Sequence, residues 1–433
     1  MKISIFGLGY VGCTGIACLS NGGFEVIGVD KSEHKVNQIN QGKPTIIEKD
    51  IDELIQKGFD EGRISATYDY THAVLETDIS IIAVGTPSTY EGHLNLEYIY
   101  KVSEEIGSAL RNKKEFHVVV IRSTVLPGTN LKVGKIIESA SGMKRGLHFD
   151  VVSNPEFLRE GSAVNDYYHP PVTVIGSSNE KAIQITTELY KDLPAPIKIV
   201  SIEVAEFIKY VNNSWHALKI TFANEVGNIC KRLKIDSHEV MDLFVMDKQL
   251  NLSDYYLKPG FAYGGSCLPK DLKGLQTIAH DNYLKSPVLS SIERSNELQK
   301  RIAIEMIEKY NKKKLGIIGL SFKKGTDDLR YSPIVEVAEY FLGKGYSIKV
   351  YDKYINMSKL TGTNLDYINK QIPHLSGMIT DNLNEVIQDA EIVVINHKIS
   401  DIVPLIDKHK DVFFIDLVKV SERKHTNCEG ICW

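Results

Sequence analysis

Residues 3–30, ISIFGLGYVGCTGIACLSNGGFEVIGVD, decide the fold of this chain. The run ISIF predicts a strand, the glycines after it predict a tight turn, and the stretch that follows predicts a helix. The run EVIGVD then predicts a second strand that ends in Asp30. Strand, turn, helix and strand together form a βαβ unit, which belongs to a sheet of parallel strands.

The glycines of this unit have the spacing GxGxxG. The first permits the turn, the second lets the backbone approach a pyrophosphate, and the third lets the helix pack on the strand. The N-terminus of the helix supplies N–H donors to phosphates. Asp30 would accept hydrogen bonds from a ribose 2′-OH and would repel a 2′-phosphate, which favours NAD over NADP. A tight turn that binds nothing is the alternative. The cofactor contacts expected here are Gly7, Gly9, Tyr10, Val11, Gly12 and Asp30.

Further apolar runs continue the alternation of strand and helix. They are DISIIAVGTP (78–87), HVVVIRSTVLPG (117–128), FDVVSNPEF (149–157) and PVTVIG (171–176). Thr86 and Thr124 lie at the ends of the first two runs. Ligands of open α/β sheets bind at the carboxyl ends of strands, so we expect both hydroxyls to face the cofactor.

The pattern changes after the turn cluster at 193–196. Ser201 is suited to cap a helix that continues to about 233 without an internal break signal. Four more strands are then predicted, at 315–320, 347–352, 390–396 and 412–417. We therefore predict an α/β chain of two doubly wound, Rossmann-like domains joined by a long central helix. The expected boundaries are 1–200 for the NAD-binding domain, 201–300 for the central helical domain and 301–433 for the second Rossmann-like domain.

The long helix carries a polar seam. Lys209, Asn213, His216 and Asn224 are spaced so that all four lie along one face. A seam that faces solvent is one explanation. The other is a cleft lined by a cation, two amides and an imidazole, which suits hydroxyl-rich and anionic ligands.

The stretch FAYGGSCLPKD (261–271) contains a candidate nucleophile. Pro269 fits the first turn of a helix, which would place Cys267 at the N-terminus of that helix. The positive end of the helix dipole and nearby Lys270 both favour the thiolate, and Asp271 is a candidate proton acceptor. A buried structural thiol is the alternative.

An NAD site and an activated thiol together suggest one chemistry. Oxidation of a primary alcohol to an acid removes four electrons, so two hydrides must leave in sequence. A thiolate can hold the intermediate aldehyde as a thiohemiacetal, and loss of the second hydride then gives a thioester that water cleaves.

Composition excludes several other classes. Lysine and arginine number 51 against 55 aspartates and glutamates, and a net charge of −4 does not favour nucleic acid or an anionic membrane as partner. The beginning of the sequence does not resemble a secretory signal, and six scattered cysteines form neither a disulfide framework nor a zinc motif. We expect a cytoplasmic protein without a metal site.

Together these motifs resemble the nucleotide-sugar 6-dehydrogenase family, which includes UDP-glucose and GDP-mannose dehydrogenases. The matching segments are GLGYVG (7–12), VGTPS (84–88), RSTVLPG (122–128), NPEFLREG (154–161), the helix seam, GGSCLPKD (264–271) and SFKKGTDDLRYSP (321–333). The resemblance covers essentially the whole chain. It implies a dimer whose substrate site is completed by the partner chain, with the nucleotide bound by the second α/β domain.

The resemblance also implies roles for matching positions. Cys267 would be the nucleophile, and the residues implied for substrate positioning, oxyanion stabilisation and water activation are Glu160, Lys209, Asn213, Asp271 and Thr124. Those implied for NAD are Asp30, Lys35, Thr86, Thr124, Lys270 and Arg330. Those implied for the nucleotide sugar, besides Glu160, Lys209 and Asn213, are His216, Asn224, Tyr255, Tyr256, Lys258, Phe261, Gly264 and Lys323.

Within the family, residues 247–271 and the final GICW are most similar to the members that act on GDP-mannose. Lys258 departs from their pattern, in which arginine stands before Pro259, and lysine cannot make the planar bidentate contact of a guanidinium. Cys428 and Cys432 have no assigned chemistry.

The resemblance therefore implies oxidation of GDP-mannose at C6 to GDP-mannuronate as the leading hypothesis, and three alternatives remain open. The first is the same chemistry on UDP-glucose or a UDP-hexosamine. The second is a two-electron hydroxyacid dehydrogenase, which has no use for a thiol at GGSC. The third is an NAD-binding scaffold without activity.

Overall fold

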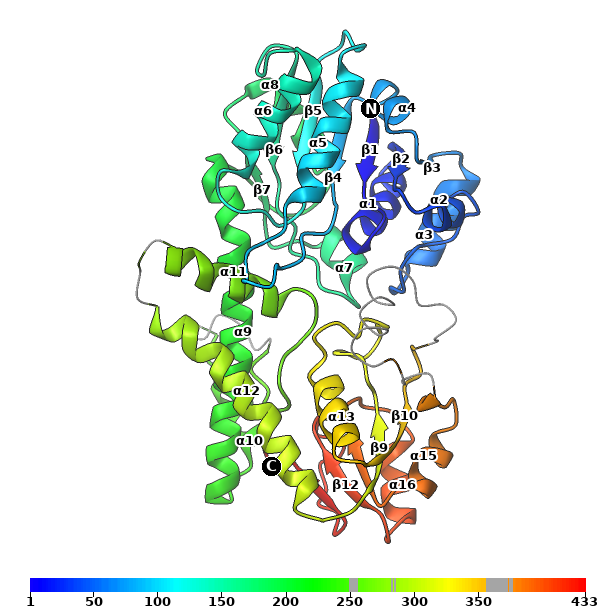
Figure 1. Ribbon diagram of the computed structural model, residues 1–433, viewed down its shortest axis with the longest axis vertical. Coiled ribbons are helices and arrows are strands. Elements are labelled where there is room, and N and C mark those ends of the chain that lie inside the picture. The colour runs from blue at the N-terminus through cyan, green and yellow to red at the C-terminus, as the bar shows by residue number, and fades with distance from the viewer. Residues whose placement is uncertain (249–255, 282, 284–285, 356–372, 374–376) are drawn as a thin grey trace. The chain divides into compact units, whose positions relative to one another are not determined.

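The computed structural model describes residues 1–248, 256–281, 283, 286–355, 373 and 377–433. These residues form two compact units, Met1–Val211 and Asn212–Trp433. Each unit contains a sheet of mostly parallel strands accompanied by helices (Figure 1). The predicted fold class, two Rossmann-like α/β domains with a long helix between them in the chain, is confirmed.

The first unit is built on an eight-stranded sheet of order β3-β2-β1-β4-β5-β6-β7-β8. Its strands are β1 (Lys2–Phe6), β2 (Glu25–Val29), β3 (Ile64–Thr67), β4 (Ile79–Ile82), β5 (His117–Ile121), β6 (Phe149–Ser153), β7 (Thr173–Gly176) and β8 (Ile197–Val200). Its helices before the long one are α1 (Tyr10–Asn21), α2 (Glu33–Ile39), α3 (Ile51–Asp60), α4 (Tyr70–Leu75), α5 (Glu97–Leu110), α6 (Thr129–Ser141), α7 (Ala163–Tyr168) and α8 (Glu180–Glu188). Neighbouring strands run parallel except β6 and β7.

The strand order creates a ligand position at the centre of this sheet. β1 pairs with β2 on one side and with β4 on the other, so Phe6 lies between Val29 and Ile82. The chain runs outward from β1 to β2 and β3, and then crosses back to β4 on the other side of β1. Ligands of open α/β sheets bind where the strand order reverses in this way. The GxGxxG turn begins at the next residue, Gly7.

A chain of polar side chains lies inside the first unit. The Ser80 hydroxyl contacts the Ser4 hydroxyl at 2.8 Å and Nε2 of His117 at 2.8 Å, and all three side chains are fully buried. Burial, reinforced by the nearby Lys113 ammonium, lowers the pKa of His117 to about 3. The imidazole is therefore neutral in the folded protein at any pH above about 3.

This histidine predicts a pH-dependent stability. The unfolded chain protonates His117 below about pH 6.5 and the folded chain does not, so stability contributed by this site is lost as pH falls through that value. Between pH 7 and pH 5 the loss is about 2 kcal/mol. In urea unfolding, a His117→Gln protein should show a pH dependence smaller by that amount. An unchanged dependence would contradict the assignment.

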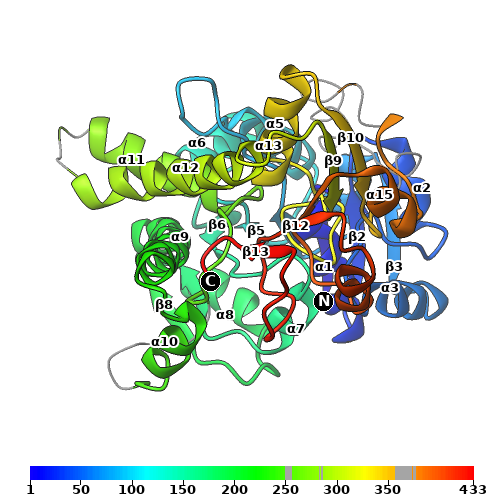
Figure 2. The same ribbon diagram turned by 90° about the horizontal axis from the view of Figure 1, so that it is seen from below.

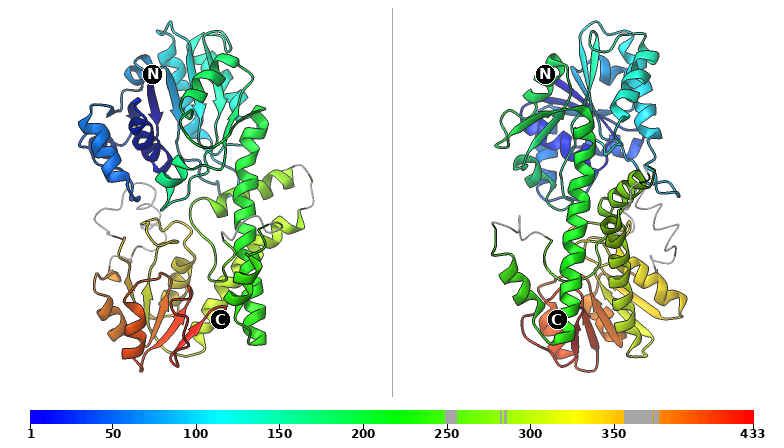
Figure 3. Two further views of the ribbon diagram at one scale, coloured as in Figure 1. Left: turned by 180° about the vertical axis from the view of Figure 1, so that it is seen from behind. Right: turned by 90° about the vertical axis from the view of Figure 1, so that its left-hand side faces the viewer.

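The long helix is α9, Ile202–Leu233, in agreement with the predicted range. It is a single continuous helix (Figure 3). The backbone N–H of Val204 donates to Oγ of Ser201 at 3.4 Å, which is the predicted cap. The first part of α9 belongs to the first unit and the remainder to the second.

The second unit has a parallel sheet of order β10-β9-β11-β12-β13. Its strands are β9 (Lys314–Ile318), β10 (Ser347–Tyr351), β11 (Ile392–Ile395), β12 (Phe413–Asp416) and β13 (Cys428–Gly430). Its helices are α10 (Ser237–Phe244), α11 (Leu268–Asp281), α12 (Pro287–Glu308), α13 (Pro333–Gly343), α15 (Leu383–Asp389) and α16 (Ile402–Lys408). Helices α11 and α12 lie side by side (Figure 2). Among the described residues, no helix has an apolar stretch long enough to cross a bilayer.

The turn that follows β9 has the same hydrogen bonds as the glycine turn that follows β1. Gly319 N donates to Tyr351 O at 2.8 Å, and Oδ2 of Asp352 accepts from Leu320 N at 2.7 Å. A Cβ at Gly319 would lie 2.2 Å from the His397 ring. Ser321, which stands at the position of Gly9, is fully buried, so this turn lacks the open backbone that a dinucleotide needs.

Candidate functional site

The glycine turn of the first unit has the geometry that a dinucleotide needs. Gly7 has φ +98°, in the left-handed region that favours glycine. A Cβ at Gly12 would lie 1.8 Å from Gly7 O, so no larger residue fits there. A Cβ at Gly9 would meet nothing within 4 Å, which leaves its backbone open to a ligand. Helix α1 begins at Tyr10 without an acidic residue in its first turn or a side-chain cap, so its N–H donors are available to a phosphate.

Asp30 closes this turn from the end of β2. Its Oδ2 accepts from Leu8 N at 2.8 Å and its Oδ1 accepts from Ser32 N at 2.9 Å. Nζ of Lys35 lies 3.5 Å from Oδ2, so the two side chains predicted to contact NAD lie together. The carboxylate is held in place while its side chain stays 11% exposed. The residues of this turn fit the predicted NAD.

Thr86 and Thr124 lie in neighbouring loops after β4 and β5. Oγ1 of Thr86 donates to Thr124 O at 2.9 Å, and Oγ of Ser123 donates to Val84 O at 2.7 Å. These bonds join the two loops at the carboxyl edge of the sheet. The structure thus brings together the two predicted threonines, although the Thr86 hydroxyl already donates to the neighbouring loop.

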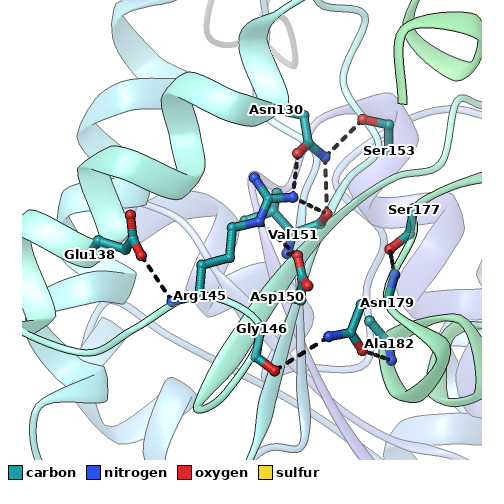
Figure 4. A network of polar contacts seen from close by, with 10 residues as sticks. All are labelled: Asn130, Glu138, Arg145, Gly146, Asp150, Val151, Ser153, Ser177, Asn179 and Ala182. Atoms are coloured by element: carbon teal, nitrogen blue, oxygen red, sulfur yellow. Dashed lines mark hydrogen bonds and ion pairs between the residues drawn. The ribbon is translucent and has the colours of Figure 1, made fainter. Parts of the chain in front are cut away.

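The segment after Thr124 is held by a buried carboxylate of α9. Glu206 accepts from Gly128 N and Asn130 N, both at 2.7 Å, and so caps the start of α6. The side chain of Asn130 is held in turn by Arg145, whose Nη2 donates to its Oδ1 at 2.8 Å (Figure 4). Glu206 stands one turn before Lys209. The network therefore fixes the Thr124 loop against the helix that carries Lys209.

Lys209 forms a buried ion pair that the sequence did not predict. Its Nζ lies 2.9 Å from Oε1 of Glu156, and both side chains are at least nine-tenths buried. Burial by itself would raise the pKa of Glu156, but the Lys209 ammonium and the Leu158 N–H outweigh burial and hold it below its usual value. Glu156 belongs to the motif NPEFLREG (154–161), from which only Glu160 was predicted as a site residue. The pair keeps a cation and a carboxylate charged inside the first unit.

Glu160 lies in the same segment, which is tied to the glycine turn. Gly161 N donates to the Tyr10 hydroxyl at 2.7 Å and to Oε2 of Glu48 at 2.7 Å. Tyr10, predicted from the glycine motif, thus contacts the residue next to Glu160. The buried carboxylate of Glu48 had no signal in the sequence.

Cys267 occupies the predicted position at a helix N-terminus. Helix α11 begins at Leu268, and Asp271 N donates to Cys267 O at 3.0 Å, the first hydrogen bond of that helix. Oγ of Ser266 lies 3.8 Å from Sγ of Cys267, and the residue is partly exposed. A partly exposed cysteine at a helix N-terminus is in the kind of environment that favours a reactive thiolate.

Asp271, one turn into α11, gathers two other predicted residues. It is fully buried, its Oδ2 accepts from Nδ2 of Asn213, and its Oδ1 lies 3.3 Å from Nζ of Lys270. The carboxylate is thus oriented by an amide of α9 and neutralised by an adjacent cation. Within the second unit, the structure brings together Cys267, Asp271, Asn213 and Lys270.

The two glycines before Cys267 have a packing role. A Cβ at Gly264 would lie 2.3 Å from Tyr331 O, and one at Gly265 would lie 2.7 Å from the Phe322 ring. Both contacts belong to SFKKGTDDLRYSP, so this motif packs directly on the cysteine loop. Arg330 of the same motif makes a bidentate contact with Asp328, with Nε–Oδ1 2.9 Å and Nη2–Oδ2 2.5 Å.

The residues predicted for the nucleotide sugar lie in several parts of the second unit. The His216 and Tyr256 rings are 5.2 Å apart, and Lys258 and Lys323 are exposed. Asn224 is 2% exposed, and its amide bonds to Gly260 N and Phe261 O, so it holds the loop that carries Lys258. Tyr255 lies outside the described residues.

Comparisons with known proteins cover the whole chain. Residues 1–194 match the NAD binding domain, residues 203–298 the central domain and residues 316–422 the UDP binding domain of the UDP-glucose/GDP-mannose dehydrogenase family. GDP-mannose 6-dehydrogenase of Pseudomonas aeruginosa is 48% identical over 436 residues, which cover 100% of both chains. The solved structure of a UDP-glucose dehydrogenase from the hyperthermophilic archaeon Pyrobaculum islandicum is 32% identical, with a TM-score of 0.88, over 100% of this chain and 98% of that one. A ternary complex of GDP-mannose dehydrogenase from Pseudomonas aeruginosa is 47% identical, with a TM-score of 0.58, over 100% of both chains.

Proposed function

The chain belongs to the UDP-glucose/GDP-mannose dehydrogenase family, and on this premise we propose that it oxidises GDP-mannose at C6 to GDP-mannuronate with two NAD. The observation that supports GDP-mannose as the substrate is the 48% identity, over the full length of both chains, to a GDP-mannose 6-dehydrogenase. Identity to the UDP-glucose dehydrogenase of known structure is 32%. The overall reaction converts one alcohol, two NAD⁺ and one water into one carboxylic acid, two NADH and two protons.

NAD is the cofactor of this family's N-terminal domain, and the first unit supplies the residues that would hold it. The open backbone of Gly9 and the free N-terminus of α1 would receive the pyrophosphate, and Asp30 the ribose hydroxyls. NAD held there would supply the hydride acceptor for each of the two oxidations. Lys35, Thr86, Thr124, Lys270 and Arg330 remain proposed contacts of this cofactor.

Asp30 carries a testable part of this assignment. Asp30→Asn removes the charge that repels a 2′-phosphate and weakens the ribose contact, while the amide oxygen still accepts from Leu8 N. The ratio of kcat/KM for NAD to that for NADP should fall by about 10–100-fold, since hydrogen bonds to charged groups contribute about 1.5–3 kcal/mol.

Asp352→Asn is the matched control for Asp30. It changes the carboxylate that closes the corresponding turn of the second sheet and should leave the NAD to NADP ratio unaltered. A ratio that moves equally in both variants would contradict a specific role of Asp30.

Cys267 performs the covalent step of the proposed mechanism. After the first oxidation, the thiolate adds to C6 of the aldehyde and forms a thiohemiacetal, and the second oxidation converts this adduct into a thioester. The Lys209 ammonium and the Asn213 amide are proposed to stabilise the oxyanion that forms at each addition. The geometry that supports these roles is the position of Cys267 directly before α11 and the buried ion pair of Lys209 with Glu156.

Hydrolysis of the thioester completes the reaction. Water adds to the thioester carbonyl and gives a proton to a carboxylate. The bond between carbon and sulfur then breaks, which regenerates the Cys267 thiolate and releases the acid. Asp271 is the proposed acceptor of this proton, and Glu160 and Thr124 are proposed to position the water. The hydrogen bond from Asn213 and the contact with Lys270 hold the Asp271 carboxyl group in a fixed position.

The nucleotide sugar is proposed to bind residues of the central and C-terminal parts of the chain. These are His216, Asn224, Tyr255, Tyr256, Lys258, Phe261, Gly264 and Lys323. Exposed Lys258 and Lys323 are cations suited to a diphosphate, which lysine binds as a point charge. We assign 1–200 to NAD, 201–300 to the central helical domain and 301–433 to the nucleotide sugar, and the matched family domains support this division.

A homodimer is the proposed assembly. Val204, Phe207 and Val211 on the first part of α9, and Trp215 and Phe222 on the second, are each 36–51% exposed. Their spacing places them on one face of the helix, and an exposed apolar stripe of this kind marks an interaction surface. All six cysteines are free thiols, which supports the proposed cytoplasmic location.

Product analysis with a panel of nucleotide sugars tests the substrate. The protein, incubated with NAD and separately with GDP-mannose, UDP-glucose or a UDP-hexosamine, should form uronate from GDP-mannose with the highest kcat/KM. A higher kcat/KM for a UDP-sugar would overturn the assignment of GDP-mannose as the substrate but would leave the proposed four-electron oxidation intact.

A further inference from the structure

Three side-chain amides hold the backbone of residues 257–263, the loop that carries Lys258 and Phe261. Asn224 on α9 accepts from Gly260 N at 2.9 Å and donates to Phe261 O at 3.1 Å. Asn296 on α12 accepts from Tyr263 N at 2.8 Å and donates to Tyr263 O at 2.9 Å. One turn along α12, Nε2 of Gln299 donates to Gly260 O at 2.5 Å. The loop is thus fixed by its main chain, while the side chain of Lys258 is exposed and that of Phe261 is partly exposed.

The thiol of Cys432 takes part in the same network. Its Sγ accepts from Nε2 of Gln299 at 3.4 Å and lies 3.6 Å from Gly260 O and 3.7 Å from Oδ1 of Asn228, the two acceptors within its reach. Oε1 of Gln299 accepts from Nδ2 of Asn228 at 2.8 Å. Burial raises the pKa of Cys432 to about 11, so the sulfur keeps its proton at neutral pH and remains a donor. Gln299 and Cys432 are 2% and 0% exposed, so these two side chains are shielded from water.

The backbone around Cys432 is held by other groups. Ser237 Oγ donates to Cys432 O at 2.7 Å, Lys231 Nζ donates to Gly430 O at 2.8 Å, and Ile431 N donates to Asp416 O at 2.9 Å. The segment Gly430–Trp433 therefore has a fixed position that does not depend on the thiol.

Gly227 on α9 allows the loop and this segment to meet. A Cβ there would lie 2.7 Å from Cβ of Pro259 and 2.8 Å from Cβ of Cys432. Pro259 is the residue between Lys258 and Gly260. The loop and the side chain of Cys432 thus pack against the same point of the helix and against each other.

We propose that Cys432 and Gln299 are positioning residues for the nucleotide sugar, because they fix the Gly260 carbonyl and thereby the place of Lys258 and Phe261. This inference rests on the proposed function, which assigns those two side chains to the substrate. Lys258 is a single flexible cation, so its contact with a diphosphate depends on where the loop places its backbone. The glycine turn proposed for NAD belongs to the first unit, and no proposed NAD contact is a member of this network, which lies in the second unit. Removing hydrogen bonds from this network should therefore weaken binding of the nucleotide sugar and leave binding of NAD unchanged.

The test compares steady-state constants of wild type, Cys432→Ala, Cys432→Ser and Gln299→Leu. Cys432→Ala and Gln299→Leu should raise KM for GDP-mannose about fivefold or more, the effect of losing a buried hydrogen bond. KM for NAD and kcat should stay within about twofold of wild type, because a hydrogen bond lost here does not touch the cofactor. Cys432→Ser retains a donor and an acceptor and should restore most of the affinity. Cys428→Ala, on the adjacent strand β13, is the matched control and should change nothing.

Each other outcome contradicts the inference. An unchanged KM for GDP-mannose in Cys432→Ala and Gln299→Leu would overturn it. A similar change in kcat, in KM for GDP-mannose and in KM for NAD would show that the two residues only contribute to packing. If wild type does not oxidise GDP-mannose, the proposed function fails before the variants are compared.

Hydrogen exchange in the wild-type protein covers the case in which the variants do not fold. Amides of 257–261 and 430–433 should gain protection together on binding GDP-mannose and not on binding NAD. Protection confined to one of the two segments would contradict the coupling.

Discussion

Replacing Cys267 by alanine should lower the rate of GDP-mannuronate formation by at least about 10³-fold, because the covalent route through thiohemiacetal and thioester is lost. The first oxidation does not need the thiol, so a single turnover of Cys267→Ala should stop at one NADH per active site. The measurement is NADH absorbance in a rapid-mixing experiment, with product analysis of the sugar.

The control for this variant is another thiol. Cys428→Ala changes a partly exposed cysteine on β13 and should keep the wild-type rate. NAD affinity should be unaltered in both variants, since the proposed NAD residues of the glycine turn belong to the first unit. Two NADH per sugar from Cys267→Ala at the wild-type rate would eliminate the covalent mechanism.

The second large effect is expected at Lys209. Lys209→Met leaves the Glu156 carboxylate buried without its cation, and breaking a buried ion pair costs about 3–5 kcal/mol of stability. The same substitution removes the proposed oxyanion stabiliser, so kcat should fall by about 10²–10³-fold. Urea unfolding and steady-state kinetics measure the two losses separately.

The pH dependence of this pair changes sign in the variant. In wild type the pKa of Glu156 lies below its usual value, so the pair stabilises the fold above about pH 4.5 and this contribution is lost as pH falls further. In Lys209→Met burial is opposed only by the weaker effects of the Leu158 N–H and Arg122, so the pKa of Glu156 should rise. The variant should therefore gain stability between pH 7 and pH 5 relative to wild type.

A double variant separates structure from catalysis. Lys209→Met combined with Glu156→Gln contains no buried charge at this site and should recover most of the lost stability while remaining inactive. If the double variant unfolds as easily as Lys209→Met, the uncompensated charge is not the cause.

The elements that sequence predicted well are those with long or regular signals. Helix α9 matches its predicted range because 32 residues without a break leave no other interpretation. The central strands were found from continuous apolar runs, and the family inferred from the motifs is confirmed by the match of all three domains. The strands that were not predicted, β3, β8 and β13, all stand at sheet edges. Edge strands are short and half exposed, so they lack an apolar run.

The site was predictable only where its residues carry a local pattern. The position of Cys267 before a helix followed from Pro269, and the open Gly9 backbone followed from GxGxxG. The partner of Lys209 could not be predicted, because an ion pair between β6–α7 and α9 leaves no trace in either segment alone. A role for Cys432 could not be predicted for the same reason, because its contacts with Gln299 and Gly260 join segments that are distant in the sequence.

The central claim is that one enzyme carries an alcohol through a sulfur-bound aldehyde to an acid, and the stoichiometry of the reaction tests it most directly. With limiting GDP-mannose and excess NAD, wild-type protein should produce two NADH for each GDP-mannuronate and release no free aldehyde. A ratio of one NADH per sugar, or accumulation of aldehyde in solution, would contradict the account.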